Sequence, residues 1–130
     1  MSRIAGKNTA PEMLVRRFLH GLGYRYGLHN KNLPGKPDIV LTRFKTIINI
    51  HGCFWHGHEH CKYFSLPKTR TMWWWDKING NRLNDEKVEK LLKKEGWKII
   101  TIWGCQLKTK TVKKTLGKLA IKLEKLRMKS

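Results

Sequence analysis

The sequence predicts an α/β fold in which a mixed central sheet is flanked by helices. Two kinds of observation support this class: apolar residues recur at helical spacing in three segments, and short apolar strand-like runs lie between those segments. A third observation is size, because 130 residues with 40% hydrophobic content suffice for one core. No segment has the composition of an interdomain linker, so we treat residues 1–130 as a single domain.

The N-terminal part is predicted to form a helix and then a strand. Thr9-Ala-Pro-Glu12 has the pattern of a helix start: a threonine cap, a proline in the first turn and a glutamate three residues on. Gly21 and Gly23 mark the helix end. Apolar residues at 24, 26 and 28 alternate with other residue types, which favours a half-buried strand, and residues 30–37 are rich in turn formers. The residues on the apolar face of the helix are Leu14, Val15, Phe18, Leu19 and Leu22.

The remaining elements alternate between strand and helix. We expect strands at 38–41, 46–50 and 98–103, and helices at 73–95 and from Thr111 onward. Gly96 is the predicted stop of the long helix. Residues 107–130 are predicted to be a basic C-terminal helix that packs on the domain. Its apolar stripe consists of Val112, Leu116, Leu119, Leu123 and Leu126.

The charge of the chain predicts a polyanionic partner. Twenty-eight Lys and Arg residues against nine acidic ones leave a formal charge of +19, and nucleic acid is the favoured partner. A ribosomal-type or merely basic protein is one alternative, and membrane-surface binding by the amphipathic C-terminal helix is another. We expect no membrane span and no signal peptide. The three cysteines could all belong to one metal site, which favours a reducing, cytoplasmic interior over a disulfide scaffold.

Residues 51–61 crowd metal-binding side chains into one short segment. Cys53, His58 and Cys61 follow a C-x4-H-x2-C spacing, and Cys105 lies far downstream. Three sulfurs and one imidazole match a closed tetrahedral zinc site. Alternatively the cysteines are small core residues. His60 competes with His58 for the fourth ligand position.

Acid–base residues lie close to this segment. Asp38 opens a predicted strand, where a carboxylate can hold Mg²⁺ beside a phosphate, although aspartate is also a common turn residue. The cap already accounts for Glu12. Many nucleases keep a Glu-x-Lys pair after the second strand, and the pair is missing from this sequence. His51 and His56 would therefore replace that pair in catalysis. Alternatively, they only support the zinc ligands.

Aromatic residues form the last notable pattern. Phe54 and Trp55 lie inside the Cys/His segment, and Trp73, Trp74 and Trp75 are consecutive. Successive helical residues point about 100° apart, so the three indoles cannot all face one core. In a basic protein this favours stacking on bases or wedging between them. For any single tryptophan, ordinary packing is an equal alternative.

Taken together, these residues resemble the very-short-patch-repair (Vsr) endonucleases. The run His-Gly-Cys-Phe-Trp-His at 51–56 is highly specific, and the resemblance covers roughly residues 1–107 in the same order. The matching stretches are Lys7-Asn-Thr-Ala-Pro-Glu12, Leu33-Pro-Gly-Lys-Pro-Asp38, His51-Gly-Cys-Phe-Trp-His56, Pro67-Lys-Thr-Arg-Thr71 with the tryptophans after it, and Gly96-Trp97 through Trp103-Gly-Cys105.

The resemblance implies a restriction-endonuclease-like core and a single Vsr-like domain with a structural zinc site. It implies Mg²⁺-dependent nicking of double-stranded DNA 5′ of the thymine in T:G mismatches, which arise when 5-methylcytosine deaminates. The enzyme would be a bacterial, nucleoid-associated monomer. Two rival hypotheses are a non-catalytic zinc-dependent DNA-binding protein and a nuclease of this fold with a restriction-type or structure-specific target.

The resemblance also assigns roles to residues. Asp38 and the backbone carbonyl of Ile50 would bind Mg²⁺, His56 would act on the attacking water, and His51 would assist at the phosphate. Glu12 would orient a histidine. The implied zinc ligands are Cys53, His58, Cys61 and Cys105. The expected DNA contacts are the wedge residues Phe54, Trp55 and Trp74, with Met1, Lys68 and Arg70.

Three features depart from the family pattern. The chain begins about a dozen residues later than most relatives, so an arm that embraces DNA is expected to be shorter. The spacing from His58 to Cys61 is one residue longer than in some relatives. The lysine-rich segment after residue 107 is expected to be an appended element whose basic face meets phosphate.

Overall fold

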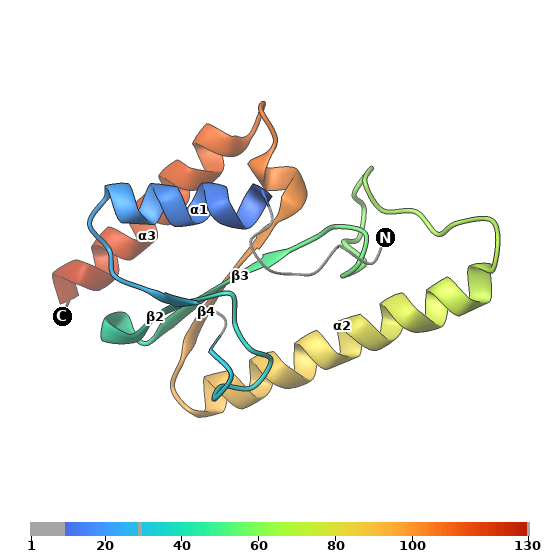
Figure 1. Cartoon of the computed structure of the whole chain (residues 1–130), viewed down its shortest axis with the longest axis horizontal. Helices are drawn as coiled ribbons and strands as arrows, with labels where there is room; N and C mark the ends of the chain where they lie inside the picture. The colour runs from blue at the N-terminus through green and yellow to red at the C-terminus, as the bar shows by residue number, and fades with distance from the viewer. Residues whose placement is uncertain (1–9, 29, 130) are drawn as a thin grey trace.

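The structure, a computed structural model, describes residues 10–28 and 30–129 (Figure 1). The predicted threonine cap at residue 9 and the expected DNA contact Met1 lie outside these residues. The helices are α1 (Ala10–Gly21), α2 (Thr71–Lys94) and α3 (Val112–Lys129), with short 3₁₀ turns η1 (Thr42–Phe44) and η2 (Gly104–Leu107). The strands are β1 (Gly27–Leu28), β2 (Ile39–Leu41), β3 (Thr46–His51) and β4 (Lys98–Trp103).

The four strands form one mixed sheet in the order β1-β2-β3-β4. The first two pairings are antiparallel, whereas β3 and β4 are parallel, with Thr46 opposite Lys98 and His51 opposite Trp103. Parallel neighbours need a long crossover, and α2 supplies it. The predicted α/β class and the mixed sheet are therefore confirmed.

The two faces of the sheet are covered by different helices, as Figure 1 shows, with α1 and α3 on one side and α2 on the other. Alternating strand residues explain this division. Ile48 lies in a buried cluster with residues of α1 and α3, and its neighbour Ile47 lies in a second cluster with Leu92 of α2. The larger cluster consists of Val15, Leu19, Tyr24, Ile39, Leu41, Ile48, Ile102, Leu107, Leu119 and Leu123.

The C-terminal helix packs through the stripe that the sequence predicts. Leu119 and Leu123 are buried in the larger cluster, and the other three stripe residues pack partly buried against it. The exposed side chains of this helix are mostly lysines. Among the described residues, no helix combines the length and apolar character needed to cross a bilayer.

The first strand is much shorter than predicted. Tyr24 is buried and Tyr26 packs against the core, yet only Gly27 and Leu28 form ladder pairs. The reason is the partner strand: in this antiparallel register earlier positions would face residues after Val40, where β2 ends at Leu41 and η1 begins at Thr42. The side-chain alternation was correct, but tertiary packing rather than a ladder accounts for it.

Candidate functional site

The register between β3 and β4 brings the distant cysteine to the Cys/His loop. Paired residues in these strands are fifty-two positions apart, and Cys53 and Cys105, just past the two strand ends, keep the same offset. The Cys105 backbone N–H donates to the Cys53 sulfur at 3.3 Å. The two sulfurs of this pair are therefore positioned by the sheet itself.

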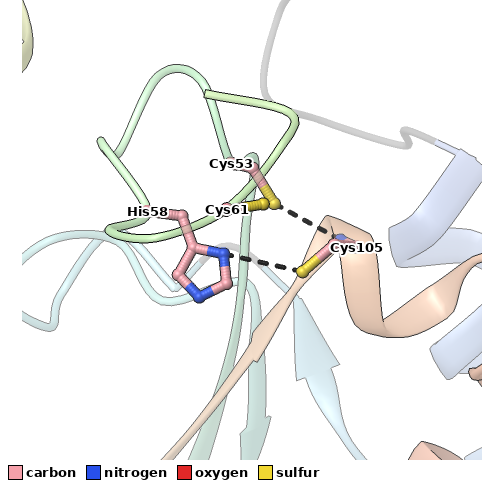
Figure 2. Close-up of side chains that lie close together, drawn as sticks. All are labelled: Cys53, His58, Cys61 and Cys105. Atoms are coloured by element: carbon pink, nitrogen blue, oxygen red, sulfur yellow. Dashed lines mark hydrogen bonds between the residues drawn. The ribbon is translucent and has the colours of Figure 1, made fainter. Parts of the chain in front are cut away.

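Four side chains converge at this point, as Figure 2 shows: Cys53, His58, Cys61 and Cys105. Their ligand atoms all lie within 4.8 Å of one another, and the separation between His58 Nδ1 and Cys105 Sγ is 3.5 Å. The His58 ring also stacks on Trp103, with ring centroids 4.1 Å apart. His60 is exposed and lies outside this group, so the structure brings His58 rather than His60 to the sulfurs.

The charges of this cluster suit a cation. A hydrogen bond from the Tyr63 backbone lowers the pKa of Cys61. Burial, followed by the neighbouring Cys53 and Cys61 sulfurs, raises the pKa of Cys105 to about 12. Burial and the neighbouring sulfurs thus disfavour a thiolate at Cys105, and a cation between the sulfurs would stabilise the deprotonated form that a metal ligand requires. Three sulfurs and an imidazole form a donor set that fits a tetrahedral metal and leaves no position for water.

A second constellation lies on the α2 side of the sheet. Asp38, His51 and His56 line one cavity of about 190 Å³, together with Ile50 and the α2 residue Asp85. The Ile50 backbone N–H donates to Asp38 Oδ2 at 2.8 Å, which fixes the orientation of that carboxylate. Sequence-distant candidates for acid–base chemistry thus share one cavity.

The two histidines have different environments. Their rings stack with centroids 4.0 Å apart and planes within 2° of parallel. Burial, and next the adjacent His56, lower the pKa of His51 to about 4, so this imidazole is neutral at neutral pH. His56 Nδ1 lies 2.6 Å from Asp85 Oδ2. In its neutral form, His56 can donate Nδ1–H to this carboxylate and leave Nε2 free to accept a proton.

The helix α2 holds the loop through one stripe of side chains that the sequence analysis did not single out. Asn81 Nδ2 donates to the Trp55 carbonyl at 2.8 Å, Arg82 Nε donates to the Gly57 carbonyl at 3.0 Å, and Asp85 meets His56. These residues share a helix face because they recur at spacings of three and four. That spacing of polar residues was the signal available in the sequence.

Gly57 is required at the closest approach of the loop to α2. It has a φ of +58°, and a Cβ added there would lie 2.5 Å from Arg82 Nε and 2.7 Å from Ile78 Cγ2. L-residues with side chains rarely adopt this backbone conformation. The glycine therefore sets how near the loop, and His56 within it, comes to Asp85.

The aromatic residues divide into a packed group and an exposed group. Phe54, Trp55 and Trp74 contact one another, with ring centroids 5.2 to 5.7 Å apart. Trp73 and Trp75 are 46% and 40% exposed, which agrees with the prediction that the three indoles cannot all face one core. Of the two basic residues expected to contact DNA, Lys68 is exposed before α2, and the exposed Arg70 lies 4.9 Å from the Trp73 ring centroid.

Glu12 has a setting that the helix-cap interpretation does not describe. Its side chain is buried in α1, and Arg16 Nη1 lies 3.6 Å from Glu12 Oε2. A buried carboxylate needs such a partner. Glu12 is not one of the described residues that line the cavity of Asp38 and the histidines. Its orienting role toward a histidine stays a prediction.

Comparison with known proteins gives the class of this site. A profile of the family described as "DNA mismatch endonuclease Vsr" matches residues 1–62. The chain is 47% identical over 107 residues to "Type II nicking enzyme V.XorIIP" of Xanthomonas oryzae pv. oryzae, which covers 82% of this chain and 78% of the relative. It is 47% identical over 112 residues to "Type II nicking enzyme V.NmeAIP" of Neisseria meningitidis, which covers 86% and 79%.

A third relative extends this similarity. "DNA mismatch endonuclease Vsr" of Escherichia coli K12 is 38% identical over 108 residues, or 83% of this chain and 69% of the relative. With its α/β fold and the two side-chain clusters described above, the protein is an enzyme of the endonuclease class. The chain belongs to the Vsr family.

Removal of one cluster ligand should release a bound divalent metal. We expect His58→Ala and Cys105→Ser each to lower the metal content of the purified protein from about one ion per chain toward zero, because three donors hold a structural ion poorly. Both should also lower the thermal midpoint, since metal binding and folding are linked. Elemental analysis and thermal unfolding provide the measurement. His60→Ala is the matched control, and loss of the ion in that variant instead would overturn the ligand assignment.

A side chain at residue 57 should push the loop away from α2. Gly57→Ala is expected to lower the free energy of unfolding by about 2–4 kcal/mol, because backbone strain adds to overpacking against Arg82 and Ile78. Gly52→Ala is the control, since the nearest atom to its added Cβ is 3.9 Å away in Trp55. Chemical denaturation measures both. Equal stability of the two variants would contradict the close approach at Gly57.

Proposed function

We propose that the chain is a Mg²⁺-dependent DNA mismatch endonuclease that nicks one strand of a duplex 5′ of the thymine in a T:G mismatch. The observation that carries the proposal is the shared cavity of Asp38, His51 and His56, in a chain of the Vsr family. The names of the relatives, "DNA mismatch endonuclease" and "Type II nicking enzyme", support the substrate and the nicking outcome.

The residues of the cavity fit a hydrolytic role. The Asp38 carboxylate and the Ile50 backbone carbonyl are the oxygen donors that would hold Mg²⁺, which when bound supplies Lewis-acid polarisation of the scissile phosphate. His56 Nε2 would take the proton of the attacking water while Asp85 holds the ring through Nδ1. The neutral His51 would assist at the phosphate by donating a hydrogen bond, since burial keeps it uncharged.

We assign structural Zn²⁺ to Cys53, His58, Cys61 and Cys105. Thiolate and imidazole donors in a closed tetrahedral set favour zinc over magnesium. The ion would hold the loop that carries His56 against the end of β4, so zinc loss would disorder the base as well as the fold. In this role zinc takes no part in the hydrolysis.

DNA binding would come from charge and from the aromatic residues. The net charge of +19 favours phosphate contacts with a steep dependence on salt. Lys68 and Arg70 are exposed in the segment that precedes α2, and Arg70 contacts the Trp73 ring. Phe54, Trp55 and Trp74 would wedge beside the mispair, where unstacking costs less than in a matched duplex. We further propose that the enzyme acts as a monomer at the bacterial nucleoid in the cytoplasm.

A second candidate function keeps the nicking chemistry and changes the target. The two relatives with 47% identity are named type II nicking enzymes rather than mismatch endonucleases. These names favour a nuclease of the same fold with a restriction-type target. The mispair assay described below separates the two candidates when the flanking bases are varied.

The Asp38 carboxylate should be required for nicking and dispensable for DNA binding. We expect Asp38→Ala to lower the nicking rate by at least about a thousandfold while the DNA affinity changes less than about threefold, because only the transition state needs the bound cation. Single-turnover nicking and a gel-shift titration give the two quantities. Glu95→Ala, an exposed acidic control, should nick normally. Wild-type nicking by Asp38→Ala would refute the metal role.

The mispair preference can be tested with matched duplexes. Duplexes with T:G, T:A or C:G at one position in otherwise identical sequence should be nicked only at T:G, at the bond 5′ of the thymine, and only with Mg²⁺ added. Denaturing gels map the nick. Equal nicking of all three duplexes would refute mismatch selection, and intact T:G duplex in every tested flanking sequence would favour the non-catalytic DNA-binding alternative.

A further inference from the structure

A second group of metal-binding side chains lies apart from the cysteine cluster. His51, His56 and Asp85 each offer one ligand atom, and these atoms all lie within 4.8 Å of one another. The side chains of His56 and Asp85 are 27% and 28% exposed, so the group is partly buried but accessible. Neither Asp38 nor Ile50 belongs to this group.

The donor types distinguish this group from a magnesium site. Two imidazole nitrogens and one carboxylate oxygen suit zinc and similar transition metals, whereas Mg²⁺ prefers an all-oxygen set. A neutral imidazole ring offers one nitrogen lone pair to a metal. Three protein ligands leave a fourth position open.

The surroundings of the group also favour a cation. All three residues line a cavity of about 460 Å³, whose wall also carries three glutamates, Glu59, Glu86 and Glu89, against one arginine, Arg82. In a chain of net charge +19, this is a local concentration of acidic side chains. A divalent ion entering the cavity therefore meets a favourable potential before it reaches the ligands.

The geometry requires little movement to accept an ion. The His51 and His56 rings are parallel and 4.0 Å apart, so their nitrogens can face the same side of the stack. Zinc bonds of about 2 Å in a tetrahedron place ligand atoms roughly 3.3 Å apart. From separations of at most 4.8 Å, the widest pair would close by about 1.5 Å at most, and His56 Nδ1 and Asp85 Oδ2, now 2.6 Å apart, would separate by about 0.7 Å. Metal bound at His56 Nδ1 would replace the proton now shared with Asp85, and that proton would move to Nε2.

We propose that His51, His56 and Asp85 form an inhibitory transition-metal site that binds Zn²⁺. A zinc ion bound at His56 Nδ1 moves the ring proton to Nε2, so Nε2 no longer has a lone pair to accept a proton from water. Asp85 then binds the metal and no longer orients the His56 ring. Binding at this site is independent of the proposed function, and only the inhibition rests on it. The enzyme would thus hold one zinc ion for stability and be blocked by a second.

The binding test counts zinc ions per chain. After gel filtration in micromolar ZnCl₂ with millimolar MgCl₂, the wild-type protein should hold two zinc ions, and Asp85→Asn and His51→Gln should each hold one. His60→Ala and Asp38→Ala should hold two, because neither residue belongs to the group. Circular dichroism and the retained first ion establish that the variants fold. One zinc ion in the wild type, or loss of the second ion in Asp38→Ala, would overturn the proposal.

The inhibition test uses nicking of the T:G duplex. Added Zn²⁺ should lower the wild-type rate at least tenfold at fixed MgCl₂, and a tenfold rise in MgCl₂ should not restore it. A rate unchanged by a second bound zinc ion, or raised by it, would overturn the inhibitory role. If the protein nicks no duplex at all, the proposed function fails while the zinc count still decides the existence of the site.

Discussion

The parallel pairing of β3 with β4 is the constraint on which the site depends. Its register sets His51 beside Trp103, and the same offset holds for the pair Cys53 and Cys105 just past the strand ends. A slip of the ladder by one residue would reverse the sides on which His51 and its neighbours point. The buried residues of β3, which pack into two different clusters, hold the register in place. The ligand cluster and the cavity are thus two results of one pairing.

Two sets of contacts hold the loop after β3: the ligand cluster and the side chains of α2. At one end, the sulfurs and His58 tie it to the end of β4, and along its length α2 binds its carbonyls through Asn81 and Arg82. Loop carbonyls that would otherwise need water as a partner are satisfied in this way. His56 lies between these two attachments, so its ring is oriented by neighbours on both sides rather than by its own short segment.

Much of the fold and part of the site follow from local sequence patterns, and the remainder depends on distant contacts. Periodicity predicts β4 with its observed bounds and places α3 from Thr111, although residues 107–111 of the predicted C-terminal helix are the end of η2 and a turn. The spacing of Cys53, His58 and Cys61 is local and predicts three ligands of the cluster, whereas the position of Cys105 depends on the pairing of β3 with β4. Asp85 lies twenty-nine positions from His56, so only the packing of α2 against the loop reveals it. The choice between His58 and His60 likewise required the loop conformation. The burial of Glu12 and its ion pair with Arg16 depend on how α1 packs, which a capping pattern does not reveal.

The length of α2 between Trp74 and Asp85 is constrained at both ends. Trp74, in the aromatic group, and Asp85, beside His56, lie on the same face of one uninterrupted helix, about three turns or roughly 16 Å apart. The helix therefore fixes both the distance and the relative rotation between these two residues. Deleting or inserting a single residue between them would rotate one against the other by about 100°. Natural length variation in this lineage should therefore fall in the surrounding loops and spare this stretch of helix.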